Sequence, residues 1–121
     1  MTPTEIFVYG TLMPGQLRWP ALQPFASRVR QDTVPGRLYR TPYGWPAADF
    51  RPSSANVPGA VVTIHRDKTA VALSTLDAIE GVDSGLFTRR GVLTCQGSLC
   101  WSYQWAGNCG HFELIAKWPA M

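Results

Sequence analysis

The chain has 121 residues, of which 45% are hydrophobic and 16% charged, and its formal net charge is +3. This length favours one domain over residues 1–121, and the hydrophobic content supports a packed core, which excludes a disordered chain. The 11 basic residues are scattered, so they do not form the dense basic run typical of nucleic-acid binding. No segment approaches the roughly 20 apolar residues of a membrane helix, and residues 1–7 lack the pattern of a signal peptide. We therefore expect a cytoplasmic protein that binds neither nucleic acid nor membranes.

Strands are predicted along the first half of the chain. Residues 5–9 are a nearly continuous run of apolar, β-branched and aromatic side chains, which indicates a strand buried on both faces. Residues 11–15 indicate a loop, and residues 16–22 indicate a short helical turn interrupted by Pro20. After weak alternation at residues 27–33, further strands are predicted at residues 36–40, 45–50 and 57–65. The segment 45–50 contains a proline and is therefore expected at a sheet edge.

The second half of the chain carries the clearest helix. It is predicted over residues 68–80, with Asp67 as the capping residue at its start and Gly81 at its end. A hairpin is predicted from residues 86–95 and 99–105, and the tail is mixed. Strands outnumber helices, which gives an α+β fold, and many short strands with glycine breaks could close into a small mixed β-barrel with flanking short helices.

Glu80 is the candidate catalytic residue. Around the helix axis it lies about 20° from Leu73 and about 40° from Leu76, which places it on the apolar side of the predicted helix. It also lies in the last helical turn, where the helix dipole is unfavourable for a carboxylate. Burial and the dipole would both raise its pKa and make it a better base near neutral pH. The alternative is that the helix end frays and Glu80 points to water.

Asp77 is expected to support Glu80. It lies on the same side of the predicted helix, about 40° from Leu73 in the other direction. From there it could orient or repel Glu80, or accept a hydrogen bond from a neighbouring backbone donor.

The loop after the first strand is a candidate binding segment. Gly10 lets the backbone approach a ligand closely, and successive N–H groups in such a turn can hold an anion. The spacing from Gly10 to Gly15 superficially resembles a phosphate-binding loop, but Gln16 and Leu17 replace its lysine and hydroxyl residue, which excludes nucleotide hydrolysis. A backbone-lined site for a carboxylate or amide remains, and the alternative is an ordinary tight turn.

Four segments of the chain carry motifs that occur together in one family. Residues 7–12 read F-V-Y-G-T-L and residues 76–81 read L-D-A-I-E-G, and residues 35–39 and 57–61 carry two strand patterns. In this order and spacing they resemble the γ-glutamylcyclotransferase-like family, with its Y-G-[ST]-L signature and L-D-x-x-E-G motif. That family includes the γ-glutamylamine cyclotransferases and AIG2-like proteins. Each motif alone is a modest signal, and the two together are specific.

The resemblance implies a small mixed β-barrel with a pocket at one end. It implies an enzyme that cyclises a γ-glutamyl amine or γ-glutamyl peptide to 5-oxoproline and releases the amine, with no metal or organic cofactor. Glu80 would then accept and donate the proton. The residues implied to hold the γ-glutamyl group are Tyr9, Gly10, Thr11 and Leu12.

One departure from the family pattern lies after the helix. Family members often carry Tyr-x-Arg there, whereas this chain has Phe87-Thr88-Arg89, so a hydroxyl near the pocket is missing. Tyr103 lies on a predicted strand that could run past the pocket and contact the ligand. The missing hydroxyl keeps open the alternative of a non-catalytic small-ligand-binding module with the same fold.

The cysteines suggest a second alternative. Cys95, Cys100, Cys109 and His111 could supply four metal ligands, but their spacing is not a standard zinc pattern. Cys95 and Cys100 could instead face each other across the predicted hairpin, as buried thiols or as a disulfide.

Overall fold

The computed structural model describes residues 3–119. Within this range the chain forms eight strands, two α-helices and two single-turn 3₁₀-helices. In chain order these are β1 (Glu5–Val8), α1 (Trp19–Leu22), η1 (Gln23–Phe25), β2 (Ala26–Pro35), β3 (Arg37–Arg40), β4 (Pro46–Asp49), β5 (Asn56–Ile64), η2 (Arg66–Lys68), α2 (Thr69–Ile79), β6 (Phe87–Leu93), β7 (Leu99–Trp105) and β8 (Glu113–Ile115).

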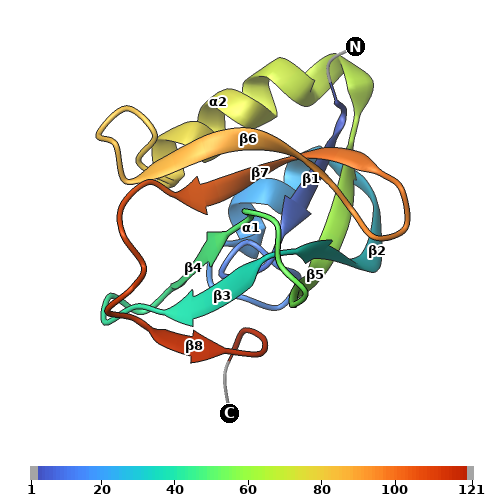
Figure 1. Cartoon of the computed structure of the whole chain (residues 1–121). Coiled ribbons are helices and arrows are strands. Elements are labelled where there is room, and N and C mark those ends of the chain that lie inside the picture. Colours follow the sequence, from blue (N-terminus) through green and yellow to red (C-terminus); the bar gives the residue numbers. More distant parts are fainter. Residues whose placement is uncertain (1–2, 120–121) are drawn as a thin grey trace.

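The strands form two sheets, and the predicted mixed α+β fold with short flanking helices is confirmed. The larger sheet has the order β2-β5-β1-β7-β6, and the smaller has the order β4-β3-β8. Helix α2 lies along one side of the larger sheet, and the smaller sheet lies on the other side (Figure 1). The expected barrel is not closed between the described strands, because the chain leaves the larger sheet after β2 and pairs β3 with β4 and β8 instead.

Strand β1 occupies the centre of the larger sheet. It pairs antiparallel with β5 and parallel with β7, so both of its edges are covered. Its side chains alternate between two cores, as expected for a pleated strand. Ile6 and Val8 pack in one core with side chains from α2, and Phe7 and Tyr9 pack in the other with side chains from β3 and β5. The prediction of a strand buried on both faces is therefore confirmed.

Helix α2 matches the predicted helix except at its start. Asp67 lies within the 3₁₀ turn η2, the N-cap is Lys68, and no side chain caps the helix. The predicted Asp67 cap is therefore wrong, because residues 66–68 tighten into a separate turn first. The end is as predicted: Glu80 is the C-cap, and Gly81 has a φ of 66°, in the left-handed region that glycine favours.

The remaining elements largely follow the predicted pattern. The hairpin is confirmed by the register from Phe87↔Trp105 to Leu93↔Leu99. Strand β4 pairs only with β3 among the described strands, so the predicted edge position of residues 45–50 is also confirmed. Pro20 was expected to interrupt the helical turn, but it lies in the first turn of α1, where a missing N–H leaves no hydrogen bond unmade. The weakly alternating segment 27–33 belongs to the long strand β2.

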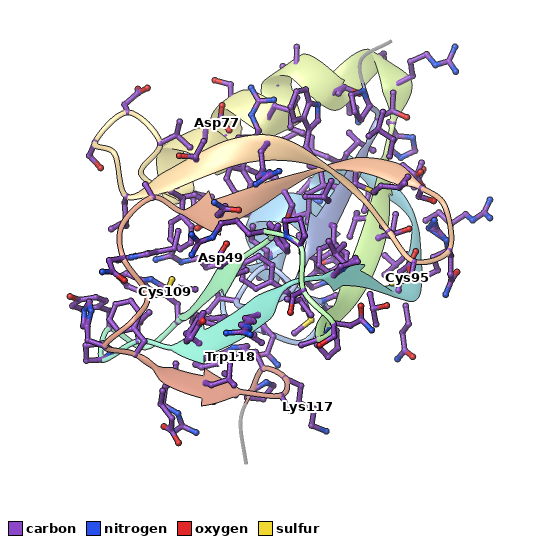
Figure 2. All side chains as sticks on the ribbon, viewed as in Figure 1. Asp49, Asp77, Cys95, Cys109, Lys117 and Trp118 are labelled. Carbon is purple, nitrogen blue, oxygen red and sulfur yellow. The ribbon has the colours of Figure 1, made fainter. Side chains whose placement is uncertain are left out.

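The three cysteines are free thiols, so the disulfide alternative is wrong. Cys100 is buried in β7 opposite Val92, whereas Cys95 is exposed in the loop beyond the end of β6. Cys95 and Cys109 lie on opposite sides of the molecule (Figure 2). Within residues 3–119, no three histidine, cysteine or acidic side chains lie together as a metal site. The zinc alternative therefore has no ligand set in the described part of the chain.

Membrane spanning by a helix was not expected. No helix in the described range is long and apolar enough to cross a bilayer.

Candidate functional site

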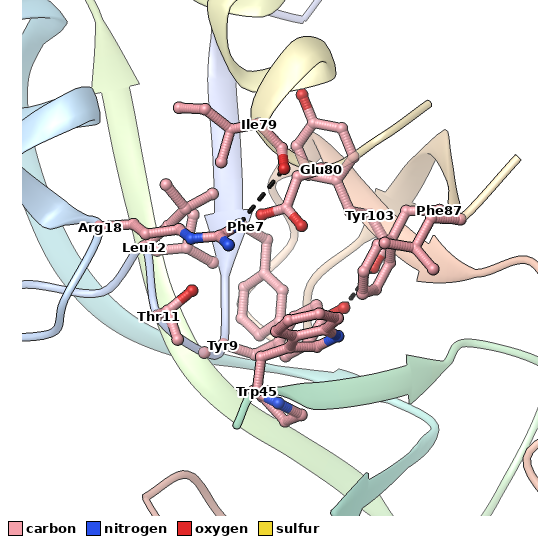
Figure 3. Close-up of a pocket in the computed structure, with 14 residues that line it drawn as sticks. Phe7, Tyr9, Thr11, Leu12, Arg18, Trp45, Ile79, Glu80, Phe87 and Tyr103 are labelled. Atoms are coloured by element: carbon pink, nitrogen blue, oxygen red, sulfur yellow. Dashed lines mark hydrogen bonds between the residues drawn. The ribbon is translucent and has the colours of Figure 1, made fainter. Parts of the chain in front are cut away.

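A pocket lies where β1 ends, between the following loop and the C-terminal end of α2 (Figure 3). It contains about 500 Å³ of empty space, part of which is open to solvent. The sequence-predicted residues that line it are Tyr9, Gly10, Thr11, Leu12, Glu80, Phe87 and Tyr103. The lining residues that the sequence did not indicate are Phe7, Val8, Arg18, Trp45, Pro46, Ile79 and Leu86. Asp77 is the one predicted site residue that does not line the pocket.

The loop after β1 brings backbone donors to one wall. Its turn is closed by the Met13 amide, which donates to the Gly10 carbonyl at 3.0 Å, and by the Arg18 amide, which donates to the Thr11 carbonyl at 2.8 Å. The amides of Thr11 and Leu12 have no acceptor in the described part of the chain. Two adjacent N–H groups without a partner are suited to a carboxylate or carbonyl oxygen.

Gly10 is needed for packing within the protein. A Cβ atom at this position would lie 2.7 Å from Cγ and 2.9 Å from Cδ of Pro46. The close approach that glycine permits is therefore to the first residue of β4. This contact holds β4 against the loop and places the neighbouring Trp45 in the pocket wall.

Tyr9 is a structural residue of the wall. Its hydroxyl donates to the backbone carbonyl of Tyr103 at 2.5 Å, which ties the end of β1 to β7. Burial, followed by the nearby charge of Glu80, raises the pKa of the Tyr9 phenol well above its ordinary value. The phenol therefore stays protonated near neutral pH and acts as a hydrogen-bond donor.

Glu80 extends from the end of α2 into the pocket (Figure 3). Its amide donates to the Leu76 carbonyl at 2.9 Å, so the backbone at this position still belongs to the last helical turn. The side chain is half-buried, and burial raises the pKa of its carboxyl group to about 7, while the charge of Arg18 opposes the shift. A carboxyl group with this pKa can accept and return a proton near neutral pH.

Arg18 is the pocket residue that sequence reasoning missed. Its Nη1 donates to the carbonyl of Ile79 at 3.3 Å, and its guanidinium carbon lies 5.8 Å from the ring centroid of Trp45. It takes part in none of the ion pairs between described residues. The residue is the N-cap of the short helix α1, 61 positions before Ile79. No local signal could have placed it beside Glu80.

Asp77 has a different partner from the one expected. Its Oδ1 accepts hydrogen bonds from Nε of Arg89 at 2.9 Å and from the hydroxyl of Tyr103 at 2.8 Å. The guanidinium group of Arg89 also lies over the ring of Trp101, at 4.5 Å. Asp77 therefore anchors α2 to β6 and β7 and positions Tyr103, and it does not contact Glu80. The expectation that it orients or repels Glu80 directly is corrected.

Phe87 contributes an apolar surface where the sequence motif favours tyrosine. Its ring lines the pocket and packs edge-on against Trp105, with 5.3 Å between ring centroids. At position 87 the pocket wall is therefore aromatic and carries no hydroxyl group.

Comparison with known proteins identifies the family. The model of the family described as gamma-glutamyl cyclotransferase, AIG2-like, matches residues 6–118. The chain belongs to the AIG2-like γ-glutamyl cyclotransferase family. Membership indicates cyclotransferase-type activity on a small molecule. A search of curated proteins finds no match to this chain.

Solved structures share the fold of this chain. An uncharacterized protein from Pyrococcus horikoshii aligns with a TM-score of 0.67 at 20% identity, covering 93% of this chain and 86% of its own. An AIG2-like protein from Mus musculus aligns with a TM-score of 0.67 at 16% identity, covering 98% and 89%. The protein YtfP from Escherichia coli aligns with a TM-score of 0.63 at 24% identity, covering 95% and 96%. At these identities the likeness concerns the fold alone.

Proposed function

We propose that this protein cyclises a γ-glutamyl amine or γ-glutamyl peptide to 5-oxoproline and releases the amine. The observation that carries the proposal is the Glu80 carboxyl group, which lies in the pocket wall of a family member and has a pKa of about 7. The reaction needs one group that takes a proton from an ammonium and later returns it to a departing nitrogen. A carboxyl group with a pKa near the working pH is suited to both steps.

The two ends of the γ-glutamyl group are matched by different polar groups. Arg18 offers a guanidinium group without an ion-pair partner in the described range, and it would bind the α-carboxylate of the substrate. The free amides of Thr11 and Leu12 would polarise the γ-carbonyl oxygen and stabilise its negative charge as the ring closes. Holding both ends fixes the flexible chain in the folded shape that the reaction requires.

The proposed chemistry is intramolecular aminolysis. Glu80 takes a proton from the α-ammonium group, and the freed nitrogen attacks the γ-carbonyl carbon to form the C–N bond of the five-membered ring. The bond between the γ-carbon and the leaving nitrogen then breaks, and Glu80 returns a proton to that nitrogen. The two protons lost by the α-nitrogen leave with the released amine, so neither water nor a cofactor is consumed.

The test is the variant Glu80→Gln, assayed for 5-oxoproline release from γ-glutamyl amines and dipeptides. We expect kcat/KM to fall by about 100-fold or more, because the amide cannot accept the proton. Glu113→Gln is the matched control, since this carboxylate is exposed on β8 and pairs with Arg40. Turnover close to wild type in Glu80→Gln would remove Glu80 from the mechanism.

A binding module is the competing function, and the apolar Phe87 in the pocket is the observation that favours it. Thermal stabilisation of the wild-type protein by γ-glutamyl compounds, with no 5-oxoproline formed, would support that function instead.

A further inference from the structure

Four aromatic rings form a continuous wall that begins in the pocket and ends outside it. Trp45 and Phe87 line the pocket, and each contacts a ring that does not. Tyr43 lies 5.5 Å from Trp45 and stacks on Trp105 at 6.3 Å with an interplanar angle of 21°. Trp105 in turn packs edge-on against Phe87, with 5.3 Å between ring centroids, so the contacts run without a break from Trp45 to Phe87. We call these four residues the aromatic wall.

One end of the aromatic wall, Phe87, lies across the pocket from Arg18, whereas the other end, Trp45, lies next to the Arg18 guanidinium group. Figure 3 shows Arg18 and Thr11 on one side of the pocket and Phe87 on the other, with Glu80 between them. A substrate bound by its carboxylate at Arg18 and attacked beside Glu80 would therefore direct its leaving group toward Phe87. From there the wall continues outward to Tyr43, which is 54% exposed.

The aromatic wall is suited to a leaving group with a flat apolar ring. Arg18 and Glu80 are the charged residues among those that line the pocket, and no carboxylate lies in the aromatic wall. An aromatic leaving group would exchange water for contact with ring faces and edges, which is favourable for apolar area.

We propose that the aromatic wall is the leaving-group subsite and that it selects substrates whose γ-glutamyl group is attached to an aromatic amine. This inference rests on the proposed function, since it names the substrate class of the same pocket. Trp45 and Phe87 would contact the leaving group inside the pocket, and Tyr43 and Trp105 connect them.

The test compares three substrates that differ in the leaving amine alone: γ-glutamyl benzylamide, γ-glutamyl methylamide and the mono-γ-glutamyl amide of putrescine. Release of 5-oxoproline gives kcat/KM for each. We expect kcat/KM for the benzylamide to exceed that of both other substrates by about tenfold or more. The benzyl ring removes more apolar area from water against the aromatic wall than the other two leaving groups do, and this burial is favourable.

Two variants at one exposed position link the preference to the wall. Tyr43→Ser removes a ring from the rim and should reduce the benzylamide-to-methylamide ratio several-fold, whereas Tyr43→Phe keeps the ring and should keep the ratio. Leu114→Ser is the control, because Leu114 is 61% exposed on β8, outside the pocket.

The outcomes separate the two proposals. If 5-oxoproline forms equally well from all three substrates, or best from the putrescine amide, the subsite is overturned and the proposed function stands. An unchanged ratio in Tyr43→Ser also overturns the subsite. If no substrate yields 5-oxoproline, the proposed function falls and the leaving-group subsite falls with it.

Discussion

At the scale of single residues, the pocket depends on two opposite charges, Glu80 and Arg18, which are both half-buried. Glu80 is half-buried and loses hydration, which favours its neutral form. Arg18 favours the charged form, and its hydrogen bond to the Ile79 carbonyl keeps the guanidinium group next to the last turn of α2, beside Glu80. The balance between burial and this cation determines how much of Glu80 is ionised at a given pH.

A pH profile of activity tests this balance. The pKa of Glu80 is about 7, and its ionised form is the base, so kcat/KM should rise with pH through about 7 and then level. In Arg18→Met the stabilising cation is absent, so the rise should move to higher pH. The KM should also increase, because the variant lacks the group proposed to bind the α-carboxylate.

A profile that does not change in Arg18→Met would contradict the electrostatic role of Arg18. Arg66→Met serves as the control, because Arg66 lies in the exposed turn η2, away from the pocket.

At the scale of the elements, the position of α2 depends on a polar anchor as well as on apolar packing. Leu73 and Leu76 bury one side of the helix against the larger sheet. Asp77 connects the same helix to both strands of the hairpin, through Arg89 in β6 and Tyr103 in β7. This anchor lies one turn before Glu80, so it also fixes where the carboxyl group enters the pocket.

The variant Asp77→Asn tests the anchor. It loses the charge that pairs with Arg89, and we expect the free energy of unfolding to fall by about 1.5–3 kcal/mol, the range typical of hydrogen bonds to charged groups. Urea denaturation measures the change. Asp83→Asn, at an exposed position in the loop after α2, should stay within about 0.5 kcal/mol of the wild type. If both variants lost the same free energy of unfolding, the hydrogen bonds of Asp77 would contribute no more to stability than an exposed carboxylate does.

At the scale of the whole molecule, the two sheets are joined by very little chain. A single residue, Gly36, separates the end of β2 from the start of β3. Its φ is 155°, and a Cβ atom there would lie 2.5 Å from the backbone carbonyl oxygen of Asp49 in β4. The smaller sheet therefore lies close against the point where the chain leaves the larger one. This sheet also carries β4, which brings Pro46 to the pocket wall.

The variant Gly36→Ala should weaken the junction. The backbone conformation is strained for alanine and the methyl group meets backbone atoms that cannot rotate away, so we expect a loss of about 1–3 kcal/mol or more in the free energy of unfolding. Gly91→Ala is the matched control, since a Cβ atom at Gly91 has no neighbour within 4 Å. Equal stability of the two variants in urea denaturation would contradict this account of the junction.

Local sequence patterns were sufficient for much of the fold. The apolar run of β1, the periodicity and glycine end of α2, and the hairpin of β6 and β7 each depend on residues that are close in sequence. The same periodicity placed Glu80 on the apolar side of its helix. The start of α2 was missed because a 3₁₀ turn competes locally with the helix, and propensity does not separate the two.

The sequence by itself determined which segments become strands and helix, and which carboxyl group is directed inward, because hydrophobic periodicity and backbone preferences are properties of neighbouring residues. The tertiary structure alone decided that Arg18 lies beside Glu80, that Asp77 binds Arg89 and Tyr103, and that β3 leaves the larger sheet. Arg18 and Ile79 are 61 positions apart and Asp77 and Tyr103 are 26 positions apart. Such contacts form only when the packed core brings distant segments together, and no local pattern records them.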